Sequence, residues 1–122
     1  MDAGMGSDSY RHYAAGYYLS AELMRRCWQA YLGDLDQPPS LASPAHASNL
    51  QGLAPASMLS CEHDPLRDEA EQYAHRLQAA GVDCTLERLP GMIHACIHLQ
   101  GVAVSTGVAV QRAGDLLRQA LT

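Results

Sequence analysis

The chain has 122 residues, a length that favours a single modest domain and lies below that of most α/β enzymes. Hydrophobic residues make up 48% and charged residues 17% of the sequence, which excludes a disordered or low-complexity chain. The net charge is −5 and the 8 basic residues are scattered, which argues against nucleic acid or an anionic membrane as the main partner.

The sequence does not open with a basic segment followed by an apolar run, and no window approaches the roughly 20 apolar residues that span a bilayer. Its 4 cysteines are widely spaced, which favours reduced thiols over disulfides. We therefore expect a cytoplasmic protein without a membrane span.

Residues 1–15 show no periodic pattern, and we expect a loop or frayed end that precedes the main segment, 16–122. A helix is predicted after Ser20, a residue that can cap it, and Gly33 is expected to end it. A long polar loop rich in Pro and Ser follows over residues 34–48. The helix has apolar side chains at helical spacing, which predict one buried face: Leu23, Met24, Cys27, Trp28, Tyr31 and Leu32.

The run Pro55–Cys61 is short, apolar and bounded by turn residues, which is typical of a buried strand. A helix is predicted next, over about 66–80, with a stripe of apolar side chains facing the core. Glu69 and Glu71 on this helix are interpreted as solvated charges.

Residues 82–89 alternate apolar and polar side chains in the manner of an edge strand, and the Pro-Gly pair at 90–91 is expected to end it. A last helix is predicted over about 104–121. The order of elements gives an α/β fold class, with a parallel βαβ unit of two strands and flanking helices. Two strands leave an edge of the sheet uncovered, so the pattern is typical of the end of a larger sheet.

An acid and a histidine follow the two predicted strands. Asp64 stands where the first strand ends, and His94 lies in the Gly-marked loop after the second. Because the carboxyl ends of parallel strands meet at one edge of a sheet, these residues are candidates for two members of a hydrolytic triad. The alternatives are ordinary: an Asp before Pro also caps turns, and a loop histidine is also common on surfaces.

Three stretches resemble a known family: D-P-L-R-D-E at 64–69, P-G-M-I-H at 90–94 and G-Y-Y-L-S-A-E-L-M-R-R-C-W-Q-A-Y-L at 16–32. Through them, residues of about 16–121 resemble the C-terminal part of the α/β-hydrolase fold, specifically the hormone-sensitive-lipase-like esterases. The resemblance implies a carboxylic ester hydrolase that needs no cofactor and acts on small esters, with short acyl chains expected.

The resemblance also implies roles for the two site residues. Asp64 would orient and support the imidazole of His94, which would act as general base towards a serine and later as general acid towards the leaving alcohol. This chain departs from the family where Gly and aromatic residues usually follow the histidine, because Ala95, Cys96 and Ile97 stand there. We expect a smaller acyl-pocket wall and an altered substrate fit.

The sequence contains no Gly-x-Ser-x-Gly pentapeptide and no H-G-G-G-type oxyanion motif. The nearest match, A-V-S-T-G at 103–107, follows the histidine, whereas the family order is Ser, Asp, His. Ser105 is therefore a weak nucleophile candidate and is better interpreted as a helix N-cap or a surface residue. We expect a partial esterase that is inactive or nearly so by itself.

Two alternatives belong to other classes. One is a zinc site, for which Cys61, His63, His94 and Cys96 offer suitable ligands, although their spacing is not that of a zinc knuckle. The other is an interaction module that covers its open sheet edge with a copy of itself, as a dimer or larger homo-oligomer, or with a separately encoded N-terminal half. Related esterases are thought to dimerise through the last strand and helix, which implies residues 83–89 and 104–121 as that surface.

Overall fold

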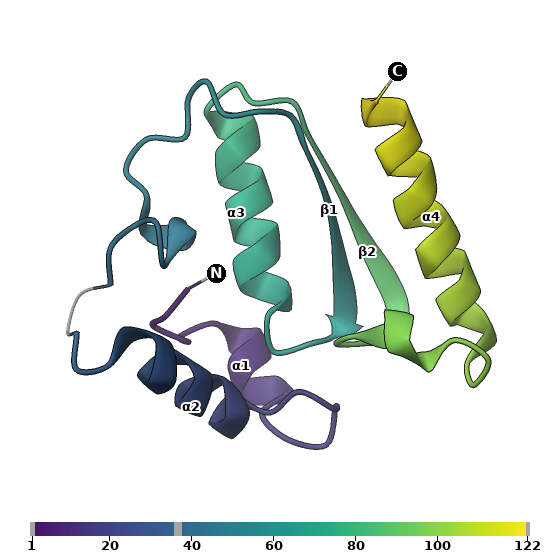
Figure 1. Cartoon of the computed structure of the whole chain (residues 1–122), viewed down its shortest axis with the longest axis horizontal. Helices are drawn as coiled ribbons and strands as arrows, with labels where there is room; N and C mark the ends of the chain where they lie inside the picture. Colours follow the sequence, from purple (N-terminus) through teal and green to yellow (C-terminus); the bar gives the residue numbers. More distant parts are fainter. Residues whose placement is uncertain (1, 36–37, 122) are drawn as a thin grey trace.

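The computed structural model describes residues 2–35 and 38–121, so residues 36 and 37 of the predicted polar loop lie outside the described residues. The elements follow in chain order as two helices, a 3-10 turn, a strand, a helix, a strand, a second 3-10 turn and a helix (Figure 1). They are α1 (Asp8–His12), α2 (Ala21–Leu32), η1 (Pro44–His46), β1 (Ala56–His63), α3 (Arg67–Ala79), β2 (Cys84–Ile93), η2 (Cys96–Leu99) and α4 (Val104–Ala120).

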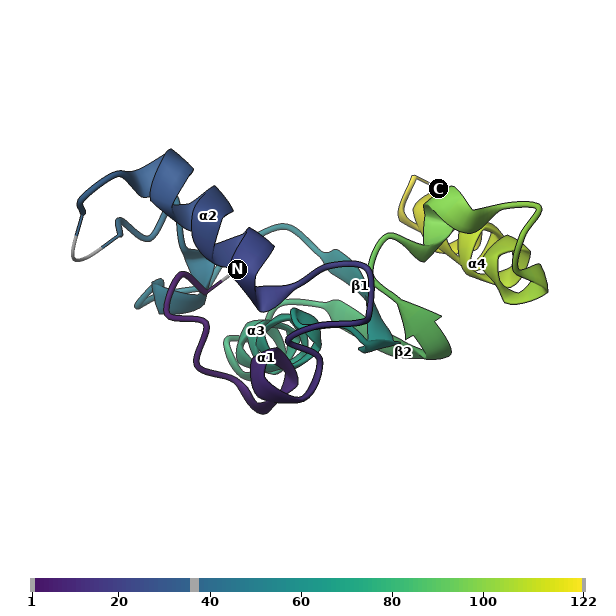
Figure 2. The same cartoon turned by 90° about the horizontal axis from the view of Figure 1, so that it is seen from below.

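The predicted βαβ unit is confirmed. β1 and β2 form a two-stranded parallel sheet in regular register from the pair Ala56–Cys84 to the pair Cys61–Leu89. α3 connects the strands and packs against both, and the strands lie between α3 and α4 in both views (Figures 1 and 2). Parallel pairing places the ends of both strands at the same edge of the sheet, next to the start of α3.

Two apolar clusters hold these elements together. The first lies between α3 and the beginning of the sheet and contains Leu50, Ala74, Leu77, Val82 and Cys84. The second joins α1 and α2 to the start of α3 and contains Tyr10, Leu19 and Met24, with Trp28 and Leu66 packed against them. Burial of each large side chain contributes about 1.5–3 kcal/mol, so the clusters provide most of the driving force for this arrangement.

The expectation of a loop or frayed end over residues 1–15 is wrong at Asp8–His12, which form α1. Ser9 and Tyr10 are buried, and the Ser9 hydroxyl donates to the carbonyl of Pro65 at 2.6 Å. Polar contacts to a distant segment hold this short helix, and such contacts leave no apolar periodicity in the sequence.

The predicted bounds of α2 are confirmed, but its predicted buried face is wrong. The Ser20 hydroxyl accepts the amide of Leu23 at 3.1 Å, and Gly33 ends the helix at a φ of 60°. Of the six apolar residues on that face only Met24 is buried, whereas the side chain of Tyr31 is 69% exposed. Helical spacing indicates which face is apolar, but it does not show that anything covers that face.

Two further expectations are wrong on α3 and β2. Glu69 is only 4% exposed, and the carboxylate of Glu71 accepts hydrogen bonds from Ser60 and Arg88, so neither is a freely solvated charge. β2 does not end at the Pro-Gly pair but continues to Ile93, with an irregularity in the register. Pro is tolerated there because an irregular position needs no ladder hydrogen bond from its nitrogen.

No helix within residues 2–35 and 38–121 combines the length and the apolar character needed to cross a membrane.

Candidate active site

Asp64 follows β1 directly and is fixed by the turn that starts α3. Its Oδ1 accepts the amide of Leu66 at 2.9 Å, and its carbonyl accepts the amide of Arg67 at 3.1 Å. Asp64 is 7% exposed and Pro65 is fully buried, so the turn is rigidly packed. This Asp-Pro turn uses one carboxylate oxygen locally and leaves Oδ2 to point towards the end of β2.

His94 follows β2, and its Nδ1 lies 2.9 Å from Oδ2 of Asp64. The His94 side chain is 34% exposed, against 10% for that of Asp64, so the ring lies between the protein and solvent. A carboxylate that accepts from Nδ1 favours the tautomer with its proton there, and Nε2 is then free to take up a proton. The structure therefore brings together the two residues that the sequence indicated, in the geometry of an oriented general base.

The loop after His94 contains a non-glycine residue in a left-handed conformation. Ala95 has a φ of 57° and a ψ of 25°, and it leads into η2. Glycine adopts this conformation at no steric cost, whereas alanine pays for its Cβ. The departure from the usual family residue thus falls at a position where the backbone prefers glycine.

Ser105 is the second residue of α4 and is exposed. The N-cap of α4 is Ala103, so the N-cap interpretation of Ser105 is wrong and the surface interpretation agrees with the structure. Within the described part of the chain, Ser105 forms no hydrogen bond with His94. The geometry does not join this serine to the acid and the histidine.

The sulfur atoms of Cys61 and Cys96 lie 3.8 Å apart, and both thiols are free. Burial raises the pKa of Cys61 to about 12, with a further contribution from Cys96, so this thiol is neutral at pH 7. The ring of His63 instead packs on Tyr13 and Tyr17, with centroids 5.5 and 5.7 Å away. Among the described residues no group of three or more His, Cys, Asp or Glu is placed to hold a metal, so the candidate zinc ligands are not assembled into a site.

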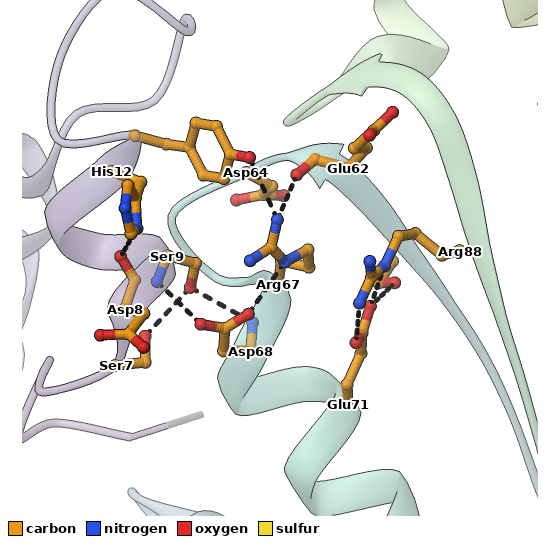
Figure 3. Close-up of polar contacts among 12 residues, drawn as sticks. Ser7, Asp8, Ser9, His12, Glu62, Asp64, Arg67, Asp68, Glu71 and Arg88 are labelled. Carbon is orange, nitrogen blue, oxygen red and sulfur yellow. Dashed lines mark hydrogen bonds and ion pairs between the residues drawn. The ribbon is translucent and has the colours of Figure 1, made fainter.

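A polar network that sequence reasoning missed surrounds the start of α3. Arg67 donates to Asp68 at 2.8 Å, to the hydroxyl of Tyr13 at 3.1 Å and to the carbonyl of Glu62 at 3.0 Å (Figure 3). Asp68 in turn accepts the amide of Ser9 at 2.8 Å. The D-P-L-R-D-E motif was the available signal, but its partners Ser9 and Tyr13 lie more than 50 positions away, and no local pattern pairs them with it.

Neither of two sizeable hollows is lined by Asp64 or His94. One of about 590 Å³ lies beside α2 and is lined by Met5, Trp28 and His46 among others. The second, of about 480 Å³, lies between α4 and the first residues of the strands. Because their linings lack both site residues, we assign neither hollow to the candidate chemistry.

Comparison with known proteins gives a consistent result. A family model described as alpha/beta hydrolase fold matches residues 2–98. The chain is 37% identical over 90 residues to the carboxylesterase NlhH of Mycobacterium tuberculosis, covering 74% of this chain and 28% of that protein. It is 31% identical over 121 residues to an ethyl acetate hydrolase of Pseudomonas putida, covering 98% of this chain and 38% of that protein.

Solved structures agree. A thermostable esterase from Pseudomonas putida superposes with a TM-score of 0.93 at 36% identity, covering all of this chain and 40% of the esterase. A bacterial heroin esterase gives a TM-score of 0.92 at 28% identity, with coverage of 100% of this chain and 40% of that one. The chain thus spans well under half the length of the relatives that it matches.

Proposed function

Since the chain belongs to the α/β-hydrolase fold family, we propose that it carries the acid and the histidine of a catalytic triad that hydrolyses carboxylic esters. The single observation that carries this proposal is the 2.9 Å contact between Nδ1 of His94 and Oδ2 of Asp64 at the ends of two parallel strands. The matched esterases and the exposure of the His94 ring support it.

In the proposed reaction, Nε2 of His94 takes the proton of a serine hydroxyl as that oxygen attacks the ester carbonyl carbon. Asp64 stabilises the resulting imidazolium, which then gives the proton to the leaving alcohol. Water then attacks the carbonyl carbon of the acyl enzyme and gives its proton to Nε2 of His94. The bond to the serine oxygen breaks, and His94 returns the proton to that oxygen as the acid leaves. The proposed substrate class is small carboxylic esters with short acyl chains, as in the esterases that the chain resembles.

We propose that the nucleophilic serine and the oxyanion donors are not supplied by these 122 residues. No Gly-x-Ser-x-Gly motif occurs in the sequence, and Ser105 lies exposed on α4 without a bond to His94. Oxyanion donors alone are worth about 10²–10³ in kcat, so the chain by itself should show little or no turnover.

The test uses the chain alone and a chimera in which it replaces the aligned segment of the Pseudomonas putida ethyl acetate hydrolase. Hydrolysis of p-nitrophenyl acetate and butyrate is measured for both. We expect no turnover by the chain alone above that of its His94→Ala variant. The chimera should be active, and His94→Ala or Asp64→Asn within it should lower kcat by at least about 10²-fold.

Ser105→Ala in the same chimera is the matched control and should leave kcat unchanged. Turnover by the isolated chain that is lost with Ser105→Ala would contradict the proposed source of the nucleophile. An active chimera that keeps its rate with His94→Ala would contradict the proposed role of the histidine.

A second candidate function is a non-catalytic interaction module, either a homo-oligomer or one half of a split esterase. The observation that favours it is the exposure of apolar side chains on α4, where Val104 is 95% and Val108 is 68% exposed. Residues 83–89 and 104–121 are the proposed surface.

The free thiols of Cys61 and Cys96, whose sulfur atoms lie 3.8 Å apart, support a reducing compartment. We therefore propose a cytoplasmic location, which cell fractionation would test.

A further inference from the structure

The two strands end out of step immediately before the candidate active site. The regular ladder ends at the pair of Cys61 and Leu89, and pairing resumes only at Ile93. In this interval β2 has residues 90–92, where β1 has only Glu62. The extra length would allow the end of β2, and with it His94, to move relative to Asp64.

The side chain of Glu62 bridges this irregularity. Its Oε2 accepts the amide of Gly91 at 2.7 Å, while Pro90 has no amide hydrogen to contribute. Gly91 has a φ of 68°, a left-handed conformation that glycine adopts without steric cost, and it lies in the interval where the regular pairing is interrupted. The carboxylate thus replaces a main-chain acceptor, in a hydrogen bond strengthened by its negative charge.

Glu62 is itself held from the other side. Its carbonyl oxygen accepts from Nη1 of Arg67 at 3.0 Å, and Nε of Arg67 donates to Asp68 at 2.8 Å (Figure 3). The backbone of Glu62 is therefore attached to the first turn of α3. Its carboxylate extends from this anchored backbone to Gly91 on the neighbouring strand.

We propose that Glu62 is a positioning residue that sets the place of His94 relative to Asp64, an inference that rests on the proposed function of those two residues. Glu62 stands two residues before Asp64, and Gly91 stands three before His94, so one hydrogen bond joins the two segments. The His94 ring has one hydrogen bond among the described residues, that to Asp64, and cannot fix its own loop. A shift of about 1 Å at such a site costs about 10²-fold in rate.

The experiment uses nuclear magnetic resonance on the isotope-labelled 122-residue chain, comparing wild type with Glu62→Gln and Glu62→Ala. Two signals are followed: exchange of the Gly91 amide with water, and the Nδ1–H proton resonance of His94 that the Asp64 hydrogen bond protects. Glu62→Ala should speed Gly91 exchange about tenfold or more and broaden the His94 signal beyond detection. Glu62→Gln keeps an acceptor oxygen at the same reach without the charge. Both of its signals should therefore lie between those of Glu62→Ala and those of wild type.

The matched control is Glu87→Ala on β2, the strand that carries Gly91; it removes the 2.6 Å ion pair with Arg112 and should leave both signals as in wild type. Unfolding curves of all variants separate local from global loosening. If Glu62→Ala does not fold, the Gln variant decides: an accelerated Gly91 amide with a weakened His94 signal supports the proposal, and unchanged signals overturn it.

The two proposals fail in different ways. A folded Glu62→Ala chain that keeps the wild-type His94 resonance overturns the role of Glu62 and leaves the Asp64–His94 pair intact. A wild-type His94 resonance that Asp64→Asn leaves unchanged contradicts the pair itself and therefore the proposed function.

Discussion

Ala95 shows how one residue can bear strain beside a candidate active site. Its φ of 57° places the Cβ close to the following carbonyl, a cost that glycine does not have. On either side of Ala95, the His94 ring contacts Asp64 and the thiol of Cys96 contacts that of Cys61.

Ala95→Gly should therefore raise the free energy of unfolding by about 0.5–1 kcal/mol, the relief of the left-handed strain less the added freedom of the unfolded chain. Urea denaturation measures the change. The control, Ala30→Gly at an exposed position in the last turn of α2, should lower stability by up to about 1 kcal/mol. A loss of stability with Ala95→Gly would contradict the strain argument.

Glu69 is a buried acid whose titration affects the stability of the whole fold. It is 4% exposed, and neither carboxylate oxygen has a hydrogen-bond partner among the described residues. Burial raises the pKa of Glu69 from 4.5 to about 7. The folded state therefore holds a proton that the unfolded state releases between these two pH values, so stability falls as pH rises from about 4.5 to 7 and then levels off.

Glu69→Gln removes this titration, and its stability relative to wild type should increase by about 3 kcal/mol between pH 4 and pH 8. Denaturant unfolding at several pH values gives the slope. Glu22→Gln is the control on an exposed acid, where a hydrogen bond from Arg26 lowers the pKa of the carboxyl, so its relative stability should change in the opposite direction. Parallel curves for Glu69→Gln and wild type would refute the burial argument.

At the scale of elements, α1 is too short to be stable by itself, and its attachment to α3 keeps it in place. Ser9 is fully buried; its hydroxyl donates to Pro65 at 2.6 Å and accepts the amide of Asp68 at 3.2 Å. The Asp68 carboxylate returns a bond by accepting the amide of Ser9. This reciprocal contact determines where the N-terminal segment lies against the start of α3 (Figure 3).

Ser9→Ala leaves a buried carbonyl and a buried amide without this partner, which should cost about 1–3 kcal/mol. Hydrogen exchange should then accelerate in residues 8–12 more than in α3. Ser57→Ala, at an exposed position of β1, is the control and should have little effect. Equal protection of α1 in wild type and Ser9→Ala would show that the apolar cluster around Tyr10 suffices to hold it.

At the scale of the whole molecule, the small sheet leaves much apolar surface exposed. The sheet contains only β1 and β2 within the described residues, so each strand keeps one free edge. On α4 the side chains of Val104, Val108 and Leu117 are 95%, 68% and 60% exposed. Val104 and Val108 lie one turn apart on one side of α4, whereas Leu117, nine residues after Val108, lies on the opposite side. Burial of these exposed apolar side chains against another chain is favourable.

We therefore expect the purified chain to self-associate, and Val108→Glu with Leu117→Glu should shift it towards monomer. Sedimentation equilibrium or light scattering measures the mass over a range of concentrations. Arg25→Glu on exposed α2 is a control for the change of charge. A wild-type chain that sediments as a monomer at all concentrations would argue against the interaction module.

The amino-acid sequence by itself determined features that depend on neighbours along the chain. Ser20 and Gly33 delimit α2, the apolar runs locate the strands and α3, and the motifs around Asp64 and His94 indicate both site residues and the family, because caps, turns and periodicity are local properties. The candidate pair was also accessible because strand ends in a parallel unit must meet at one edge.

Only the tertiary structure decided which polar groups are buried and what they contact. Glu69 is buried by segments that lie far from it in the sequence. Ser9 bonds to Asp68, 59 positions away, and Gly91 bonds to Glu62 where the strand register is irregular. The free energy of such contacts depends on desolvation and on distances of a few tenths of an ångström, neither of which a local pattern contains. For the same reason the predicted buried face of α2 was wrong, since an apolar stripe cannot determine what covers it.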